Sequence, residues 1–501
     1  MQRLAKRELR LQYTGYIIFA AKLIGVATGL IYQYMIAAVA TQGQYDIYFN
    51  LSDVLAYFTL LAGVVPFWVM RCVARGKEGA TKTGFVTNLI ISIISSVAYL
   101  AIVPLVLPIL GISGDYLTLY LVSSIQIVEL YLIGLFEPCL QATKPQAVGY
   151  GLLVQQVTKL TLGYFLIIQM RQPLFGMIIS TAIAFALQIT FYSRLMKLEM
   201  KERLQWGFVK EWLKGSLANI YTVVGNQIAN FIFILLFSLG GEGSRGIYGA
   251  AYIVVNVITY SSFLAFALYP KLLAEQKSED VTIGLKTVLM FAIPMTAIAV
   301  VLSNSYIVLL RPELIAFSGA GLVLVILALD ALVGVISGVY SSVLFGIESV
   351  DETKITFKSM VKSKIFIAFS LPYVQSAVTI PTTYFVLTTY AFQQPLLAAL
   401  SVSIINSVMR LVMFFVLVVV VRGMMKIAFP WRSVGKYTFG SVVTGVLLYL
   451  LPSSTSIAVT LLWTAIGGLV YLAILLLIDK ETRSLPKDIL REIRGKKSSL
   501  N

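Results

Sequence analysis

Long apolar segments, separated by short polar connections, follow one another along almost the whole 501-residue chain. Each segment holds roughly the 20 apolar residues that an α-helix needs to cross a bilayer. Because backbone groups in lipid must form their hydrogen bonds within the segment, such runs predict membrane-spanning helices. Fourteen spans are expected, near residues 14–40, 47–70, 84–110, 117–139, 148–168, 174–193, 216–239, 247–269, 284–309, 315–345, 365–390, 396–421, 434–451 and 456–478.

The composition narrows the function classes. Hydrophobic residues make up 58% of the chain and charged residues only 12%, which excludes a water-soluble domain. Histidine is absent, which excludes imidazole chemistry and His-based metal sites. The two cysteines, Cys72 and Cys139, belong to no CxxC pair, so neither a disulfide framework nor a zinc site is expected. The sequence has no Walker-type Gly-Lys-Ser/Thr loop and no nucleophile–base pair, so we expect no enzymatic activity and no cofactor.

Basic residues set the expected orientation. The net charge is +16, from 39 Lys and Arg against 23 Asp and Glu. With the N-terminus inside, 33 of the 39 fall in cytoplasmic segments, and only Arg171, Arg245 and Arg311 fall outside. We therefore expect a multi-pass protein of the cytoplasmic membrane with both termini in the cytoplasm. The same charges are scattered over short loops rather than gathered on one face, so no nucleic-acid partner is predicted.

A short internal echo indicates a repeat. Gly43-Gln-Tyr-Asp-Ile-Tyr48 follows the first span, and Gly243-Ser-Arg-Gly-Ile-Tyr248 follows the seventh, 200 positions later. Six-span units that both start inside are parallel repeats, related by an axis along the membrane normal. The predicted all-α polytopic protein has an N-terminal six-helix lobe (1–193), a cytoplasmic amphipathic linker (194–215), a C-terminal six-helix lobe (216–425), two additional transmembrane helices (426–478) and a basic cytoplasmic tail (479–501).

The stretch from Tyr32 to Arg75 carries a family resemblance. Its first helix ends in a short Gly–Tyr turn, and the next runs through a Gly/Pro stretch into an Arg-x-x-Ala-Arg run, Arg71 to Arg75. This pattern resembles the N-terminal signature of Wzx-type flippases of polysaccharides and lipid-linked oligosaccharides, in the multidrug/oligosaccharidyl-lipid/polysaccharide exporter superfamily. The resemblance implies two pseudo-symmetric six-helix lobes, often with two added helices, and transport of an isoprenoid-phosphate- or pyrophosphate-linked glycan by alternating access. It transfers no residue role.

Three basic residues fall within the predicted spans: Lys22 in span 1, Lys159 in span 5 and Arg410 in span 12. A charge near the bilayer centre costs at least about 2.5–3.5 kcal/mol, so each of these residues is expected to have a compensating partner or a function. A phosphate or pyrophosphate headgroup needs such partners, since Arg binds it bidentately and Lys as a point charge. We therefore predict that these three residues bind the substrate phosphate, with Lys22 and Arg410 the strongest candidates.

Two acids within the spans leave an alternative open. Glu129 in span 4 is placed to neutralise Lys159, and Asp330 in span 10 is placed to neutralise Arg410, as purely structural pairs. Span 1 has no acid of its own for Lys22. Glu129 and Asp330 are also candidate ion-coupling carboxylates for H⁺ or Na⁺. No metal centre is predicted.

Polar and aromatic residues give weaker signals. Tyr45, Tyr48, Tyr116 and Tyr248 lie near the expected outer ends of spans, where we predict an interfacial aromatic belt. Amide side chains within the spans are expected either to bind sugar hydroxyls or to form interhelical hydrogen bonds. These include Gln126, Gln155, Gln156, Asn226, Gln227, Asn230, Asn256 and Asn406.

The expected function is a monomeric flippase whose partners are a lipid-linked glycan, membrane lipids and a coupling H⁺ or Na⁺. The alternative is a cation-coupled multidrug exporter of the same superfamily, a function that favours acidic residues in an apolar cavity. Cations in three spans and two extra helices favour the anionic lipid. A glycan polymerase or membrane transferase would need a large outer loop, and the outer loops here are short. A scaffold without transport would leave the buried charges unexplained.

Overall fold

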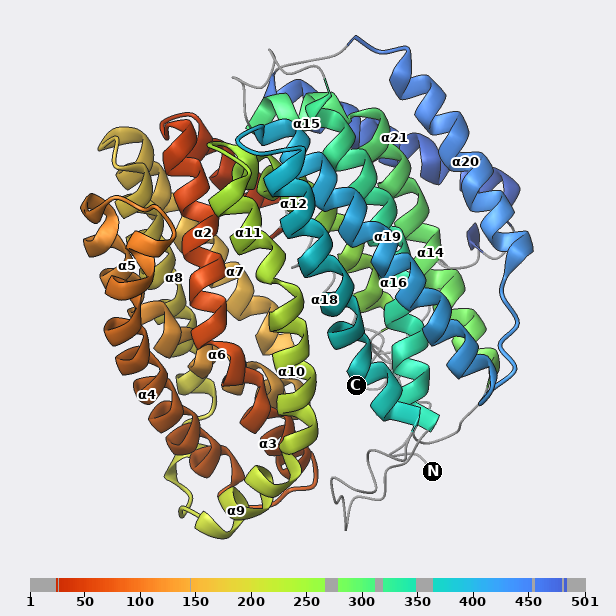
Figure 1. Cartoon of the computed structure of the whole chain (residues 1–501). Helices are drawn as coiled ribbons and strands as arrows, with labels where there is room; N and C mark the ends of the chain where they lie inside the picture. Colours follow the sequence, from red (N-terminus) through yellow and green to blue (C-terminus); the bar gives the residue numbers. More distant parts are fainter. Residues whose placement is uncertain are drawn as a thin grey trace. The chain divides into compact units, whose positions relative to one another are not determined.

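The computed structural model describes residues 24–25, 27–144, 146–265, 278–310, 319–347, 364–452, 456–479 and 482–483. Within these ranges the chain is almost entirely helical and contains no β-strand (Figure 1). Nine described segments are long and apolar enough to cross a membrane, and a tenth is added if the bent pair Gln42–Phe58 and Leu60–Ala74 is one span. These findings confirm an all-α polytopic membrane protein. The count of fourteen crossings stays a prediction.

The described helices coincide with the predicted spans. In the first, residues 27–37 are helical. The elements that follow up to the middle of the chain are α2 (Gln42–Phe58), η1 (Leu60–Gly63), α3 (Val64–Ala74), α4 (Ala80–Ile109), η2 (Gly114–Tyr116), α5 (Leu117–Ser123), α6 (Ile125–Thr143), α7 (Gln146–Gly163), the π-helical η3 (Tyr164–Gln169), α8 (Pro173–Leu195), η4 (Glu199–Lys201) and α9 (Trp206–Gly215).

The described part of the second half of the chain also consists mainly of long helices (Figure 1). Its described elements are α10 (Leu217–Ala229), α11 (Phe231–Leu239), α12 (Ser244–Thr259), η5 (Tyr260–Ala265), α14 (Ser278–Val301), α15 (Ser303–Leu310), α16 (Ala320–Ile347), α18 (Lys364–Thr389), α19 (Pro395–Arg422), α20 (Trp431–Tyr449) and α21 (Ile457–Ile478).

The second predicted span is broken rather than straight. Helix α2 and the segment formed by η1 and α3 meet at an angle of 56°. Pro66 lies in the first turn of α3, where a missing N–H costs no helical hydrogen bond. The break therefore precedes the proline, and the short 3₁₀ turn of η1 makes the bend.

The chain forms two compact units, each with its own core. The larger unit takes in the described residues from 24 to 249 and from 364 to 409. Its main core cluster joins α3, α4, α6, α7, α8 and α9 through buried side chains that include Val69, Phe136 and Tyr192. The smaller unit takes in the described residues from 250 to 347 and from 410 to 483.

The amphipathic linker packs on the larger unit. Trp212 of α9 is buried in the core cluster, and Phe208 stacks on it at a centroid distance of 5.7 Å. Ahead of α9, Gly79 N–H donates to Glu202 Oε2 at 2.5 Å. The apolar side of this predicted amphipathic segment is therefore covered by protein at Trp212, while Trp206 at its start is exposed.

In the smaller unit, α20 and α21 pack against α14. Tyr471 Oη donates to the carbonyl of Met290 at 2.8 Å, and both residues belong to a core cluster with Tyr437. Just beyond α21, Asp479 accepts hydrogen bonds from Lys436 Nζ at 2.9 Å and from the Thr482 hydroxyl at 2.7 Å. Burial by itself raises the pKa of Asp479, but these hydrogen bonds outweigh it, so its pKa lies below the ordinary value.

Candidate functional site

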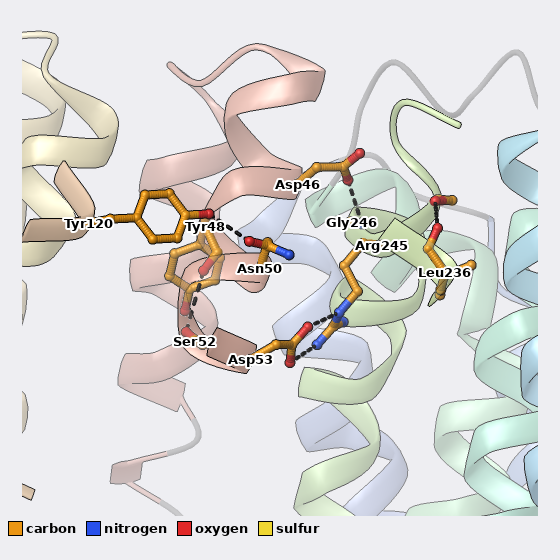
Figure 2. A network of polar contacts seen from close by, with 10 residues as sticks. Asp46, Tyr48, Asn50, Ser52, Asp53, Tyr120, Leu236, Arg245 and Gly246 are labelled. Atoms are coloured by element: carbon orange, nitrogen blue, oxygen red, sulfur yellow. Dashed lines mark hydrogen bonds and ion pairs between the residues drawn. The ribbon is translucent and has the colours of Figure 1, made fainter. Parts of the chain in front are cut away.

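A dense polar network joins the start of α2 to the start of α12 within the larger unit, and we call it the α2–α12 junction (Figure 2). Helix α2 begins at a capping box, in which Thr41 and Gln44 each accept a hydrogen bond from the other's backbone N–H. Helix α12 begins after Gly241 and Gly243, whose φ angles are +86° and +94°. Because L side chains rarely adopt such angles, glycine is needed for this tight entry into α12.

Asp46 of α2 caps the neighbouring helix rather than its own. Its Oδ1 accepts the N–H of Gly246 at 2.7 Å, and its Oδ2 accepts the N–H of Gly243 (Figure 2 shows the first bond). The first N–H groups of a helix lack intrahelical partners and carry partial positive charge, so a carboxylate there is stabilising. The buried Asp46 side chain therefore ties the start of α12 to α2.

Arg245 and Asp53 form a second link at the same junction. Arg245 donates from Nε to Asp53 Oδ2 at 2.6 Å and from Nη2 to Oδ1 at 2.8 Å (Figure 2). The two side chains are only 8% and 14% exposed. The guanidinium carbon also lies 4.9–5.9 Å from the ring centroids of Phe233, Phe49 and Tyr248. A bidentate, buried pair with aromatic faces around the cation is a strong form of ion pair.

Contacts between positions that differ by 200 recur at this junction. Asp46 accepts from Gly246, and Gln42 Nε2 donates to the carbonyl of Glu242 at 3.0 Å. Phe49 packs so tightly on Gly249 that an added Cβ there would lie 2.5 Å from the ring. The two similar segments noted in the sequence, 43–48 and 243–248, therefore contact each other at this junction.

The junction allows a first prediction. Asp46→Ala removes both acceptors from the start of α12, and loss of such a cap is expected to destabilise the protein by about 1–2 kcal/mol. Thermal unfolding of purified protein measures this, with Asp115→Ala as the control because Asp115 is an exposed acid near the start of α5. If both variants unfold at the wild-type temperature, Asp46 does not hold the two helices together.

Of the sequence-predicted phosphate ligands, Lys22 lies outside the described residues. Lys159 lies on the face of α7 that carries Gln155 and Gln156, opposite the exposed side chains of Tyr150 and Val157. Lys159 therefore projects from the less exposed face of α7, and not from the exposed apolar face of that helix.

The surroundings of Lys159 are aromatic and polar. Its Nζ lies 4.8 Å from the centroid of the Tyr32 ring, a cation–π geometry. Tyr32 is held by hydrogen bonds to Ser180 Oγ at 2.6 Å and to the Met177 carbonyl. Among the described residues no carboxylate lies within salt-bridge distance of Lys159, so the alternative of a Lys159–Glu129 pair is not realised. Glu129 is buried, and its Oε2 has no hydrogen-bond partner in the described part of the chain.

Arg410 and Asp330 do come together. Arg410 Nη1 of α19 donates to Asp330 Oδ2 of α16 at 2.5 Å, in the smaller unit. Asp330 is 5% exposed and Arg410 is 39% exposed. The pairing foreseen as a structural alternative is therefore present, and one of its members remains accessible.

The interfacial-belt prediction is wrong for two of its four tyrosines. Tyr45 and Tyr248 are buried, because both pack within the α2–α12 junction. Tyr45 Oη donates to Gln33 Oε1 at 3.1 Å, and Tyr248 lies beside Phe233. Asp46, Asp53 and Arg245 were not foreseen as a network. The one available signal was that Asp46 and Arg245 lie within the two similar segments near the expected outer surface, and that Asp53 follows the first of them by five residues.

Comparisons with known proteins identify the fold. No protein-family pattern and no curated protein matches the sequence. Among solved structures, the chain is similar to the lipid II flippase MurJ in an inward closed conformation, with a TM-score of 0.61, 16% identity, and coverage of 93% of this chain and 99% of MurJ. The chain has the same fold as MurJ. This fold is also similar to that of a multidrug resistance MATE family transporter of the MOP superfamily in its inward-facing conformation, with a TM-score of 0.60, 11% identity, and coverage of 82% of this chain and 98% of that transporter.

A variant of the Vibrio cholerae MATE transporter VcmN gives a TM-score of 0.55 at 15% identity, with coverage of 83% of this chain and 97% of VcmN. The MurJ comparison thus takes in about a tenth more of the chain than either MATE comparison. That difference is on the order of 50 residues, about the length of two membrane spans. At identities of 11–16%, the likeness to these solved structures establishes the fold of this chain alone.

Proposed function

We propose that the protein is a flippase that moves an isoprenoid phosphate- or pyrophosphate-linked oligosaccharide across the cytoplasmic membrane by alternating access, for the assembly of a polysaccharide or a glycoprotein glycan. The MOP fold and the longer match to MurJ support a lipid-flipping protein. The observation that carries the proposal is Lys159, a cation on an interior helix face with no carboxylate beside it among the described residues. An unneutralised cation at membrane depth is suited to an anionic headgroup.

The surroundings of Lys159 also include uncharged hydrogen-bonding side chains. Thr28, on the same helix as Tyr32, donates from its Oγ1 to Gln156 Oε1 of α7 at 3.1 Å, so hydroxyl and amide groups accompany the cation. Phosphate oxygens accept from an ammonium group, and sugar hydroxyls both donate to and accept from amides. A cation with neighbouring amides matches the two ends of a phosphate-linked sugar.

Alternating access requires that one side of the protein close while the other opens. In this proposal the lobes are 1–193 and 216–425, and their termini and linker face the cytoplasm. The α2–α12 junction then closes the outer side, because α2 belongs to the first lobe and α12 to the second. Its buried ion pair and trans cap stabilise the closed arrangement and break when the outer side opens. The protein acts as a monomer without enzymatic activity.

A cation-coupled multidrug exporter is the second candidate, and Glu129 is the observation that favours it. A buried carboxylate whose Oε2 lacks a partner among the described residues is suited to bind H⁺, Na⁺ or a cationic drug. In the flippase proposal Glu129 is one of two candidate coupling carboxylates, and Asp330 is the other. The substrate, not the presence of coupling, separates the two functions.

Transport in proteoliposomes decides between them. We expect the purified protein to move a fluorescent sugar linked to an isoprenyl pyrophosphate into the lumen, and a lipophilic cationic dye to leave that transport unchanged. Protein-free liposomes give the background. Transport of the dye, combined with no movement of the lipid-linked sugar, would refute the flippase and establish the exporter.

A further inference from the structure

We propose that Asp330 is an exchangeable counter-ion for Arg410, displaced by the phosphate groups of the substrate while Asp330 takes up one proton. This inference rests on the proposed function and assigns the coupling step to one pair of residues. The pair joins α16 to α19 in the smaller unit, through Arg410 Nη1 and Asp330 Oδ2 at 2.5 Å. Both residues lie in the middle of long apolar helices.

The accessible member of the pair is the cation. Arg410 lies on the face of α19 that carries the buried residues Asn406, Met413 and Leu417. The exposed apolar residues of α19 lie on its opposite face and on the two sides that flank it; they are Leu397, Ile404, Val408, Leu411, Val412, Phe415, Val416 and Val419. The 39% exposure of the Arg410 side chain is therefore exposure on an interior face. A ligand can reach the guanidinium there without approaching through the apolar surface of the helix.

Both Arg410 and Asp330 have hydrogen-bonding atoms that this pairing leaves unused. A guanidinium has five N–H donors, and among the described residues only Nη1 of Arg410 has an acceptor. Asp330 Oδ1 is buried and has no hydrogen-bond partner in the described part of the chain. A pair kept for stability is expected to satisfy its polar atoms, because unsatisfied buried groups are costly. This pair is held by one hydrogen bond, so a phosphate that engages the other guanidinium donors has to break only that bond to draw Arg410 away from Asp330.

Among the described residues, no other cation lies close enough to Asp330 to replace Arg410. Helices α14, α15 and α19 and the turn η5 pack against or bond to α16. The titratable groups on these elements are Glu279, Asp280 and Lys286 in the first turns of α14, Tyr260 in η5, Tyr306 in α15, and Arg410 and Arg422 on α19. Within the described residues, only Arg410 lies within salt-bridge distance of Asp330.

The exchange then follows from charge balance. When the Arg410 donors turn to phosphate oxygens, the buried Asp330 carboxylate loses its counter-charge. A buried carboxylate without a cation is stabilised by protonation, so one H⁺ from water converts it to the neutral acid. Arg410 stays cationic and no covalent bond of the substrate breaks. Release of the lipid reverses both events, which couples one proton to each phosphate-bearing lipid.

Calorimetric titration of the full-length protein in nanodiscs tests the exchange, with farnesyl diphosphate as the probe. Measured in two buffers of different ionisation enthalpy, wild-type binding is expected to take up about one proton per ligand. Asp330→Asn is expected to bind about tenfold more tightly, since the competing carboxylate charge is gone, and to take up no proton; tenfold is at the weak end for close charge pairs. Inorganic pyrophosphate is expected to compete with the probe in both proteins.

Matched variants separate this exchange from a structural role. Arg410→Ala should lose binding while Arg410→Lys keeps part of it, and Arg422→Ala, on the same helix but exposed, should bind as the wild type does. Asp115→Asn provides the exposed-acid control for Asp330→Asn. Size-exclusion profiles show whether each variant is folded, and Arg410→Lys and Asp330→Asn are the variants that conserve shape.

The outcomes distinguish two failures. If the wild type does not bind farnesyl diphosphate, the proposed function fails and this inference falls with it. If the wild type binds the lipid but takes up no proton, or if Asp330→Asn binds no more tightly, the exchange is overturned while the flippase proposal stands. Failure of pyrophosphate to compete also overturns it, because Arg410 would then not be recognising the phosphate groups.

Discussion

Replacing Arg245 with alanine is expected to loosen the α2–α12 junction more than any other single substitution there. Asp53 would keep its carboxylate at an almost buried position without its bidentate partner. Removing one member of a buried pair typically costs about 3–5 kcal/mol, because the other charge is left uncompensated. Asp53→Ala in the same molecule removes that charge, so the double variant is expected to regain most of the lost stability.

Two measurements check this result. Thermal unfolding of the two single variants and the double variant gives the coupling energy, with Arg171→Ala as a control for loss of an exposed arginine. Labelling of Ser244→Cys by a membrane-impermeant maleimide reports opening, since Ser244 is buried, and so are the native Cys72 and Cys139. Equal labelling with and without Arg245 would mean that the pair does not close this side of the protein.

Lys159→Ala is expected to reduce transport of the lipid-linked sugar by roughly ten- to a hundredfold, with the amount of protein in the membrane unchanged. A hydrogen bond to a charged group contributes about 1.5–3 kcal/mol, which corresponds to that range. Lys159→Arg keeps the charge and is expected to retain most of the activity. Initial rates in the proteoliposome assay give the comparison.

Substitutions around Lys159 show which of its interactions matters. Tyr32→Phe keeps the ring 4.8 Å from the ammonium group and is expected to transport nearly as the wild type does, whereas Tyr32→Leu removes the ring and is expected to be slower. Lys197→Ala is the matched control, since Lys197 is an exposed lysine of the linker. Wild-type rates for Lys159→Ala would remove Lys159 from the substrate site and with it the main support for an anionic substrate.

The helices were predictable because a backbone in lipid must satisfy its hydrogen bonds internally, which restricts its conformation. Apolar runs such as 84–110 and 396–421 became α4 and α19 almost residue for residue, since a chain in hydrocarbon must bond its own N–H and C=O groups. The break between α2 and α3 was less predictable. Pro66 pointed to a bend nearby, but the bend lies ahead of it at η1.

The partners of the charges were predictable only in part. Arg410 and Asp330 were foreseen as a pair because few charges occur within the spans, and the structure brings them together. The same reasoning offered Glu129 as the alternative partner of Lys159, whose ammonium group instead lies over the Tyr32 ring. Position along a span limits the depth of a side chain, but the face of the helix and its rotation against its neighbours decide what the side chain contacts.

The amino-acid sequence by itself determined that this is an all-helical membrane protein and where its long described helices lie, because the hydrophobicity of about 20 consecutive residues is a local property on which insertion into a bilayer directly depends. The tertiary structure alone decided that Asp46 caps a helix 200 positions away and that Arg245 binds Asp53. Such contacts depend on how separate helices pack, and the energy of a buried charge depends on the neighbour it finds there and not on its place in the sequence.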